Sequence, residues 1–300
     1  MPAWVVHPDQ AGERLDRFLA TNLPASRSRV RQLLASGAVS LDHRVMREND
    51  GGRALREGGE IEVAEDVPGL LAEGGDALEV LAEGAGWVAV NKPAGIPVHP
   101  LALGETGTLL NAVLERYPAV RGVGDEGELR SGVVHRLDVD TSGAVLFALE
   151  QARWLALRSA FTEHRVTKRY RALVSGRLSG AGRERATLAV TRHRPAYVEV
   201  VGEGHPDGRR CSLDWRVLDT GSDASEIEIN LHTGFLHQVR VMMAARGHAL
   251  LGDTTYADEL VASRAPRQML HAVSIAVDDI AAEAPLPEDY TRCREACLTR

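Results

Sequence analysis

Two carboxylates, an arginine, a histidine and two hydroxyls lie close together in one short stretch, residues 132–149, with apolar residues at both ends. The apolar ends are typical of a buried strand or strand edge. Polar groups beside a core destabilise the fold unless each finds a partner, so this stretch is better suited to chemistry than to filling space. Taken alone, Asp138 and Asp140 could form a glycosidase-like acid pair, bind a metal, pair with Arg136 or hold a hydrogen-bonded turn.

The complete string over residues 135–143, H-R-L-D-x-D-T-S-G, resembles the signature of the RluA-type pseudouridine synthases. In that family the aspartate after Arg-Leu is catalytic, and here that residue is Asp138. The resemblance gives supporting positions to the neighbouring residues of the string, which are His135, Leu137, Thr141, Ser142 and Gly143. We therefore expect the chemistry to be centred on Asp138.

Asp140 needs a separate explanation because it follows Asp138 by two positions. In a strand the two side chains would lie on the same face, and two close carboxylates oppose each other's ionisation. We therefore expect a bend that turns Asp140 away from Asp138, with the hydroxyls of Thr141 and Ser142 as its partners in the turn.

A second motif indicates the residue that would hold the base. The string K-x-Y-x-A-L-V over residues 168–174 reads as a strand and is similar to the family's tyrosine motif, so Tyr170 is expected to stack on the target base. That base must first leave its own stack, which costs a few kcal/mol. The resemblance assigns the vacated place to Arg136, whose flat guanidinium can stack there. Stacking of the base on Tyr170 would contribute ~1–3 kcal/mol.

The cation expected beside Asp138 comes from a third motif, residues 233–242, which corresponds to the family string T-G-R-x-H-Q-I-R-x-H. A closed pocket favours the neutral form of a carboxyl group unless a cation faces it, and the resemblance gives that role to Arg240. We expect a bidentate or nearly bidentate pair, because the arginine fork fits a carboxylate.

The same motif contains two matches and two departures. His237 and Gln238 agree with the family string and are expected to contact RNA. Phe235 and Met242 replace the family's arginine and histidine. We expect these replacements to change the choice of RNA rather than the chemistry, with a relative of reduced activity as the alternative.

Further strings extend the resemblance along most of the chain. N-K-P-x-G-x-P-V-H-P over residues 91–100 contains three prolines and a glycine, which predict a stiff, extended loop. It is similar to the family's first motif, and Lys92 and His99 are candidates for contacts either with RNA or within the protein. The strings around Leu270 and over residues 284–289 match the family's closing elements, so Leu270 is expected to support the site.

The first 66 residues predict a small separate module. Apolar residues at helical spacing indicate two helices, and short strands are expected at residues 38–41 and 60–63. The strings R-L-D-R-F-L and S-R-S-R-V-R-Q-L-L resemble the S4 RNA-binding module. The residues of the second helix that lie off its apolar face, and are therefore expected to contact RNA, are Arg27, Arg29, Arg31 and Gln32. A plain helical hairpin with a charged face is the alternative.

Proline and several glycines predict a linker over residues 67–77, followed by a catalytic domain over residues 78–300. The resemblance implies an α+β fold, with a mixed, mostly antiparallel curved sheet, flanking helices and a central cleft, beside the small N-terminal α/β S4-like module at residues 1–66. Helical periodicity and end signals further predict helices near residues 109–116, 151–163 and 237–246.

The charge distribution is uneven along the chain. The net charge is −7, which by itself does not favour a nucleic-acid partner. Between Gln151 and Arg216, however, 14 basic residues face 6 acidic ones, while the rest of the chain holds 21 basic and 36 acidic residues. This pattern is compatible with a locally basic groove that binds phosphates, and equally with a solvated, charged surface.

The sequence lacks several signatures of cofactor chemistry. It contains no phosphate loop, no G-x-G-x-x-G after a strand and no Cys/His spacing typical of a metal site. Cys293 and Cys297 are four apart and are expected to be reduced thiols. No apolar run approaches the ~18 residues that span a bilayer, and the N-terminus lacks the features of a signal peptide. We therefore expect a cytoplasmic, monomeric protein that acts without cofactor, metal or membrane.

The motifs together predict isomerisation of specific uridines in RNA to pseudouridine, in which the N-glycosidic bond breaks and the uracil turns and rejoins through carbon. Attack by Asp138 on the sugar carbon, attack on the base and abstraction of a sugar proton all remain open. Large-subunit ribosomal RNA is the expected substrate, because family members with an S4 module often act on it, and transfer RNA is the alternative. Two other classes are a non-catalytic, ribosome-associated RNA-binding protein and a glycoside hydrolase that uses Asp138 with Asp140.

Overall fold

The computed structural model describes residues 2–23, 27–64, 69–125 and 127–298. The chain divides into two compact units, each described here by itself. One contains Met1–Ala77, His99–Val133 and Leu149–Gln151, and the other contains Leu78–Val98, Val134–Ala148 and Ala152–Arg300. The predicted boundary between residues 66 and 67 lies outside the described residues, so the predicted domain limits stay a prediction.

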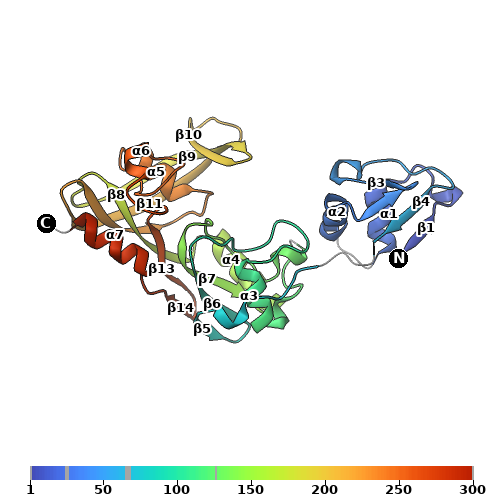
Figure 1. Ribbon diagram of the computed structural model, residues 1–300, viewed down its shortest axis with the longest axis horizontal. Coiled ribbons are helices and arrows are strands. Elements are labelled where there is room, and N and C mark those ends of the chain that lie inside the picture. The colour runs from blue at the N-terminus through green and yellow to red at the C-terminus, as the bar shows by residue number, and fades with distance from the viewer. Residues whose placement is uncertain (1, 24–26, 65–68, 126, 299–300) are drawn as a thin grey trace. The chain divides into compact units, whose positions relative to one another are not determined.

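The N-terminal part of the first unit combines a small antiparallel sheet with two helices (Figure 1). Its strands, in sheet order, are β1 (Ala3–Val5), β4 (Glu60–Val63), β2 (Val39–Leu41) and β3 (Arg44–Val45), and its helices are α1 (Leu15–Asn22) and α2 (Arg27–Ser36). Asp42 and His43 connect β2 to β3 with positive φ at both positions, the geometry of a tight two-residue hairpin turn. Apolar side chains between Val6 and Val63 form one hydrophobic core.

The later part of this unit contains α3 (Leu109–Arg116), which has the predicted bounds. Thr108 and Asn111 explain where the helix begins. The hydroxyl of Thr108 accepts from the backbone N–H of Asn111, and the Asn111 side chain accepts from the N–H of Thr108. This reciprocal cap satisfies two backbone donors that the helix cannot satisfy itself.

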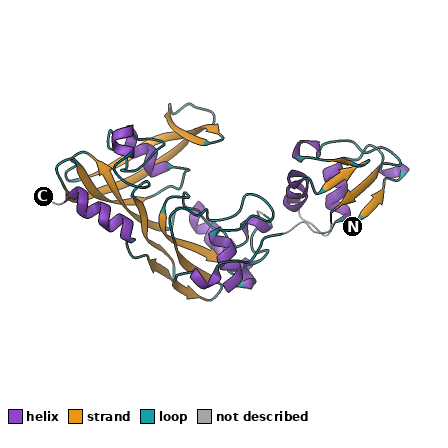
Figure 2. Ribbon diagram, in the orientation of Figure 1, coloured by secondary structure: helices purple, strands orange, loops and turns teal. Residues whose placement is uncertain are grey.

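The second unit is built on one ten-stranded sheet, drawn in orange in Figure 2. Its main path runs in the order β10 (Ala196–Val201), β9 (Ala181–His193), β11 (Arg209–Thr220), β12 (Ala224–Leu231), β8 (Thr167–Ser175), β13 (Leu270–Val277), β7 (Ser142–Ala148), β6 (Trp87–Lys92) and β5 (Val80–Gly84). The tenth strand, β14 (Ile280–Glu283), pairs with β13. Among the described strands of this sheet, only β13 and β7 pair in parallel, so the fold is α+β with the mixed, mostly antiparallel sheet that the sequence predicts.

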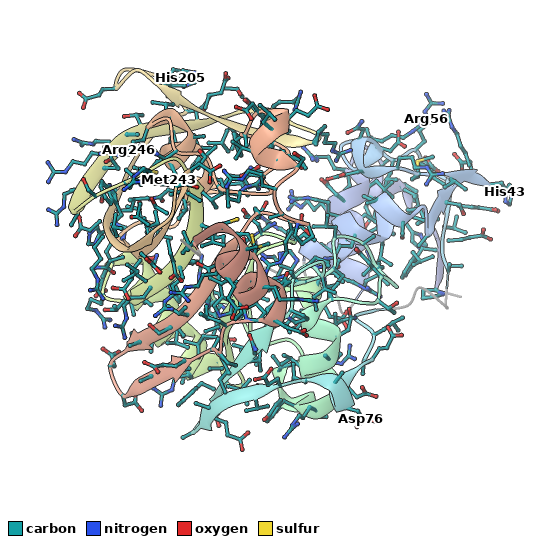
Figure 3. All side chains as sticks on the ribbon, turned by 60° about the vertical axis from the view of Figure 1, so that its left-hand side comes forward. His43, Arg56, Asp76, His205, Met243 and Arg246 are labelled. Atoms are coloured by element: carbon teal, nitrogen blue, oxygen red, sulfur yellow. The ribbon has the colours of Figure 1, made fainter. Side chains whose placement is uncertain are left out.

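Four helices accompany this sheet: α4 (Gln151–Thr162), α5 (Gln238–Ala245), α6 (Glu259–Ala262) and α7 (Glu288–Leu298). Tyr290 of α7 is fully buried in a cluster with Leu173 and Met269. Met243 and Arg246 lie at the C-terminal end of α5 (Figure 3), where Met243 is buried and the guanidinium of Arg246 stacks 4.7 Å from the ring of Trp215. These contacts hold the helices that carry and support the site.

The local pattern of β8 aims two side chains at one place. Its residues alternate between exposed and buried from Thr167 to Tyr170, so Lys168 and Tyr170 are both buried on one face of the strand. The first apolar run of the central stretch, Val133–Val134, is buried as expected but forms no extended strand, whereas the second run forms β7.

Candidate active site

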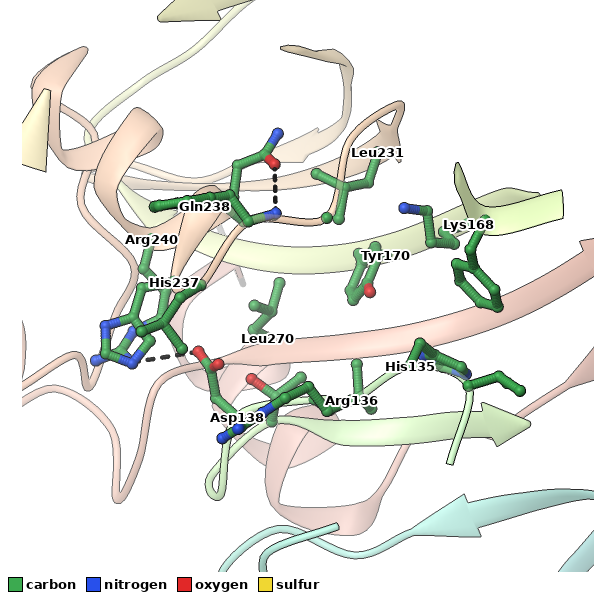
Figure 4. Close-up of a pocket in the computed structure, with 18 of the residues that line it drawn as sticks. His135, Arg136, Asp138, Lys168, Tyr170, Leu231, His237, Gln238, Arg240 and Leu270 are labelled. Carbon is green, nitrogen blue, oxygen red and sulfur yellow. Dashed lines mark hydrogen bonds and ion pairs between the residues drawn. The ribbon is translucent and has the colours of Figure 1, made fainter. Parts of the chain in front are cut away.

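A pocket of about 550 Å³ opens in the second unit (Figure 4). Its walls come from the loop before β7, from α4, from β8 and from the chain that leads into α5. Arg136, Asp138, Tyr170 and Arg240 all line it, so residues from three separate motifs meet in one place. The other side chains that reach the pocket are His135, Leu137, Thr141, Arg158, Phe161, Thr162, His164, Lys168, Leu231, Phe235, Leu236, His237, Gln238, Val239 and Leu270, with Val134 and Gly234 completing it.

The loop that carries Asp138 bends directly after it. The backbone N–H of Thr141 donates to the carbonyl of Asp138 at 3.1 Å, and Val139 and Asp140 lie exposed in the turn. The bend therefore turns Asp140 away from Asp138, as predicted. Asp138 is the one carboxylate among the described lining residues, which removes the paired-acid geometry that a glycoside hydrolase would need.

The predicted partners of Asp140 are wrong. Thr141 and Ser142 are each 2% exposed and point into the fold. The hydroxyl of Thr141 accepts from Nε2 of Gln268 at 3.1 Å, and the hydroxyl of Ser142 pairs with Nδ1 of His271 at 2.8 Å. Buried hydroxyls need protein partners, whereas the exposed carboxylate of Asp140 is solvated by water, so the loop is fixed to β13 and its preceding residues instead.

Gly143 is the position where β7 begins beside β13. Its φ is +117°, and a Cβ there would lie 2.2 Å from the carbonyl oxygen of Ala272. The parallel pairing of Gly143 with Ala272 brings the two backbones too close for any side chain. Glycine is therefore required for the loop to enter the sheet at this register.

Lys92 supports the loop that carries Asp138 through hydrogen bonds within the protein and does not face RNA. It is fully buried, and its ammonium donates to the carbonyls of Pro93, Ile96 and Val139 at 2.7–2.8 Å. Burial lowers its pKa to about 7. All three donors are used within the protein, so the prediction of an RNA contact for Lys92 is wrong and its alternative, a structural contact, holds.

Arg267 fixes the other side of the same loop. Its guanidinium pairs with Asp289 through two hydrogen bonds of 2.6 and 3.1 Å, and it donates to the carbonyl of Asp140 at 2.9 Å. It also reaches the hydroxyl of Ser142 at 3.3 Å. The turn after Asp138 is thus held by two cations that bind its backbone carbonyls.

Arg240 contacts Asp138, but not by the expected bidentate pairing. Its Nη1 lies 3.3 Å from Oδ2 of Asp138, the ion pair dashed in Figure 4. The bidentate partner is Asp253, whose two oxygens accept from Nε and Nη2 at 2.8 Å each. Asp253 is 1% exposed and Asp138 19% exposed. The fork is therefore committed to the more deeply buried carboxylate, and Nη1 is left to contact Asp138.

Asp253 is itself held in place by backbone N–H groups. Its Oδ1 accepts from the backbone N–H groups of Thr255 and Tyr256 at 2.9 and 3.2 Å. Burial raises the pKa of Asp253, but the hydrogen bonds and charge of Arg240 outweigh burial and the pKa is lowered. Asp253 is therefore ionised at neutral pH and keeps Arg240 aimed at Asp138.

Tyr170 and Arg136 differ in how they meet the pocket. Tyr170 is 7% exposed, and burial, with the nearby charge of Asp138, raises its pKa, so its hydroxyl stays protonated. Arg136 is exposed at the pocket. A buried ring offers a fixed stacking surface, while an exposed guanidinium can move, which agrees with the different tasks that the sequence predicts for them.

His237 lines the pocket and is held by Tyr256. It has a positive φ of 53° immediately before α5, and its Nδ1 lies 2.8 Å from the hydroxyl of Tyr256. That hydroxyl also accepts from the N–H of Val198 at 3.0 Å. Burial lowers the pKa of His237.

Gln238 and His99 do not offer RNA contacts. Gln238 is 3% exposed; its carbonyl accepts from the hydroxyl of Thr233 and the N–H of Phe235, and its amide donates to the carbonyl of Ser212. His99 belongs to the first unit and is 6% exposed. Both are buried, so the RNA contact predicted for Gln238 is wrong, and for His99 the alternative, a contact within the protein, holds.

The remaining residues predicted to support the site are Leu137, Leu270 and His135, which all line the pocket. Leu137 and Leu270 are buried at the pocket wall. His135 accepts from the N–H of Leu146 at 2.9 Å and stacks on Phe161 at 5.0 Å. Burial, with a smaller effect of the Lys168 charge, lowers the pKa of His135 to about 3, so it is neutral.

The two departures from the family string lie in different environments. Phe235 is half-buried and lines the pocket. Met242 is 3% exposed and belongs to the core. A direct effect of Met242 on RNA binding is therefore excluded by its burial.

The arginine-bearing helix α2 lies in the first unit. Arg27 and Arg31 are exposed, as predicted from the helical pattern. Arg29 and Gln32 are half-buried, and Nη1 of Arg29 lies 3.7 Å from Glu128. The outward-facing charge of this helix is therefore carried by Arg27 and Arg31.

Sequence reasoning missed Lys168, Asp253 and Tyr256 as members of the site. Asp253 and Tyr256 lie outside the motifs on which the sequence prediction rests. Lys168 precedes Tyr170 by two positions in a strand, and that spacing was the available signal.

The described residues contain no group of three or more His, Cys, Asp or Glu side chains arranged to hold a metal ion. Cys293 and Cys297 are free thiols with sulfur atoms 4.0 Å apart on α7. Within the described ranges, every helix is too short or too polar to cross a bilayer.

Comparison with known proteins agrees with this geometry. Residues 86–245 match the family model described as RNA pseudouridylate synthase. The chain is 37% identical over 271 residues to an uncharacterized RNA pseudouridine synthase of Chloroflexus aurantiacus, covering 89% of this chain and 83% of that protein. It is 32% identical over 313 residues to ribosomal large subunit pseudouridine synthase D of Haemophilus influenzae, covering 97% and 93%. Among solved structures, human RNA pseudouridylate synthase domain containing 1 aligns with a TM-score of 0.60 at 26% identity, covering 76% of this chain and 90% of that one.

Proposed function

Because this chain belongs to the RNA pseudouridylate synthase family, we propose that it isomerises uridines of large-subunit ribosomal RNA, with Asp138 as the reacting carboxylate. The reaction breaks the bond between N1 of uracil and C1′ of ribose and joins C5 to C1′. It needs no net oxidation or reduction. The protein must therefore supply a charged group at the sugar, a surface for the free base and exclusion of water.

One contact carries the assignment of Asp138: the single N–H that Arg240 directs at its carboxylate, 3.3 Å away, in the pocket. The cation contacts one oxygen of the carboxylate and leaves the other open to a substrate. The side chain of Asp138 is 19% exposed, so it is accessible from the pocket. Both properties are needed by a nucleophile or by a base that acts on the sugar.

The roles of Arg136 and Tyr170 follow from their burial. We propose that Arg136, which is exposed, enters the RNA stack when the target base leaves it. Tyr170, which is buried at the pocket, then stacks on the everted uracil. Both residues line the same pocket as Asp138, so the base and its ribose can be held together.

The choice of ribosomal RNA is supported by the relatives, several of which are named ribosomal large subunit pseudouridine synthase D. We further propose that residues 1–66 form an S4-like RNA-binding module in which Arg27 and Arg31 contact phosphates. Their exposure on α2 supports this role. The monomeric state and cytoplasmic location stay predictions.

The test uses RNA transcripts that carry tritium at C5 of uridine, because the hydrogen at C5 leaves when C5 is joined to C1′. The wild-type protein is incubated with large-subunit ribosomal RNA and, separately, with a pool of transfer RNAs. Release from ribosomal RNA alone supports the proposal, and release from transfer RNA alone reassigns the substrate. Tight binding of RNA without any release would make this chain a binding protein.

A further inference from the structure

Lysine is used at only two positions in this chain, Lys92 and Lys168, while the other 33 basic residues are arginine. Both lysines are buried, with exposures of 0% and 8%. Arginine stays charged under all ordinary conditions, whereas a buried lysine is a compact donor whose charge depends on its surroundings. The two ammonium groups therefore deserve separate explanations.

The ammonium of Lys168 has unused hydrogen-bonding capacity. It makes one hydrogen bond to protein, to the carbonyl of Thr233 at 3.1 Å, and lies 6.0 Å from the ring centre of Phe161. In the described part of the chain, burial alone accounts for its lowered pKa, and no carboxylate offsets the cost of burying its charge. A buried cation with free donors is costly unless a ligand completes it.

The position of Lys168 relates it to the base. It lies two residues before Tyr170 on β8, and both side chains are buried on the pocket face of the strand. In Figure 4 Tyr170 lies between Asp138 on one side and Lys168 on the other. A uracil stacked on Tyr170 with its ribose at Asp138 would therefore direct its far edge, which carries carbonyl oxygens, toward Lys168.

We propose that Lys168 is a catalytic residue that donates a hydrogen bond to a carbonyl oxygen of the everted uracil and stabilises the negative charge that the ring gains. This proposal rests on the proposed function. When Asp138 acts on the sugar, the bond between C1′ and N1 breaks and its electron pair stays on the ring. The ring delocalises that charge onto its oxygens. Later the C5–C1′ bond forms and Asp138 is released unchanged, C5 loses its proton and N1 gains one, so no other reactant is consumed.

In this role Lys168 must stabilise the charge that develops on the base during the reaction as well as bind the base. A fixed donor in a water-poor pocket is worth most where charge develops, and removal of one such donor from other enzymes lowers kcat by about 10²–10³-fold. The hydrogen bond to Thr233 orients the ammonium before the base arrives. Lys168 therefore resembles the donors of an oxyanion hole in function, although its ligand is a carbonyl oxygen of a nucleobase.

The pH dependence of the reaction separates this role from a structural one. Burial lowers the pKa of Lys168 to about 8. The titratable and charged groups that share the pocket with it are His135, Arg136, Asp138, Arg158, His164, Tyr170, His237 and Arg240. Among them the pKa values of His135 and His237 are lowered, that of His135 to about 3, and the pKa of Tyr170 is raised. A loss of activity as pH rises through about 8 is therefore assigned to deprotonation of Lys168.

The experiment measures tritium release from C5-labelled RNA by the wild-type protein, K168M and K168R between pH 6 and about 9. We expect K168M to lower kcat about 10²-fold while KM and RNA affinity change by less than about threefold. In the wild type, kcat/KM should fall with a pKa near 8, and in K168R this alkaline limb should disappear, because arginine keeps its proton. Thermal unfolding of each variant controls for folding.

A second measurement needs no activity. Protein labelled isotopically at the lysine Cε positions gives two signals, assigned with K168R. Addition of substrate RNA to the full-length D138N variant should shift the Lys168 signal and leave that of Lys92 unchanged. The inference is overturned if K168M turns over within threefold of wild type and keeps its pH profile, or if RNA leaves the Lys168 signal unmoved. Absence of turnover by the wild type on every RNA would instead overturn the proposed function.

Discussion

Two regions of the site each contain one buried lysine: Lys92 lies against the 138–141 turn, and Lys168 lines the pocket. The two ammonium groups differ in how many of their hydrogen bonds are made within the protein. Lys92 is fully buried and gives hydrogen bonds to three backbone carbonyls. In the pocket, Lys168 gives one. A polar group whose hydrogen-bond donors are all used within the protein supports the fold, and one with free donors is available to a substrate.

Arg240 combines both kinds of region in one side chain. Two of its nitrogens bind Asp253, which backbone N–H groups fix, and a third faces Asp138 in the pocket. The hydrogen bonds of Nε and Nη2 to Asp253 thus orient Nη1 toward Asp138. This arrangement keeps the cation beside Asp138 in place without occupying both carboxylate oxygens.

The largest expected effect is that of R240M, which removes the residue shared by both regions. Two carboxylates, Asp138 and the buried Asp253, would lose their cation. Loss of one partner from a buried pair costs about 3–5 kcal/mol, so the free energy of unfolding should fall by that amount in urea titrations. Activity should fall more than a hundredfold; a loss below about tenfold, or ~1.4 kcal/mol, would show that Asp138 does not depend on Arg240.

The next effect is that of K92M, which should alter stability without altering chemistry. Three part-buried carbonyls would lose their donor, and an unsatisfied buried group costs about 1–3 kcal/mol. We expect a lower free energy of unfolding and an unchanged kcat in the folded protein. Reduced kcat with full stability would contradict the supporting role.

The same variant gives a pH signature. The pKa of Lys92 is lowered from 10.5 to about 7 by burial, so between these values the folded protein binds fewer protons than the unfolded chain. Stability of the wild type therefore rises with pH from about 7 toward 10.5, and the contribution of Lys92 is least favourable below 7. K92M lacks this contribution, so the difference in stability between the two proteins should grow from pH 6 to about pH 9.

Tyr170 belongs to the pocket, and its ring should matter more than its hydroxyl. Y170L would remove a stacking surface worth ~1–3 kcal/mol and should lower kcat/KM by about ten- to a hundredfold. Y170F keeps the ring and should stay within about threefold of wild type. Equal losses in the two variants would instead assign the effect to the hydroxyl.

The smallest effect is expected for R136A, because Arg136 is exposed. Stability should not change, and kcat/KM should fall about tenfold if the guanidinium fills the place of the everted base, a loss near 1.4 kcal/mol. R292A, which changes an exposed arginine on α7, is the matched control and should have no effect. Equal kcat/KM values for the two variants would remove Arg136 from the flipping step.

The sequence predicted the residues that line the pocket better than those that hold them in place. Asp138, Tyr170 and Arg240 lie in separate motifs, and the pocket does bring them together. The bidentate partner of Arg240 could not be read from the pattern, because any carboxylate satisfies a guanidinium and only the fold decides that Asp253 is nearer. Gln238 is expected at RNA because its motif matches, but a matched polar residue can also have its hydrogen bonds satisfied within the protein.

The most direct test of the central claim is the rate of tritium release from C5-labelled ribosomal RNA by D138N beside the wild type, under single-turnover conditions. The substitution keeps the size of the side chain and removes its charge. We predict release by the wild type, no detectable release by D138N, and similar thermal unfolding and RNA affinity for both proteins. Release by D138N at a rate within tenfold of wild type would contradict the claim that this carboxylate performs the reaction.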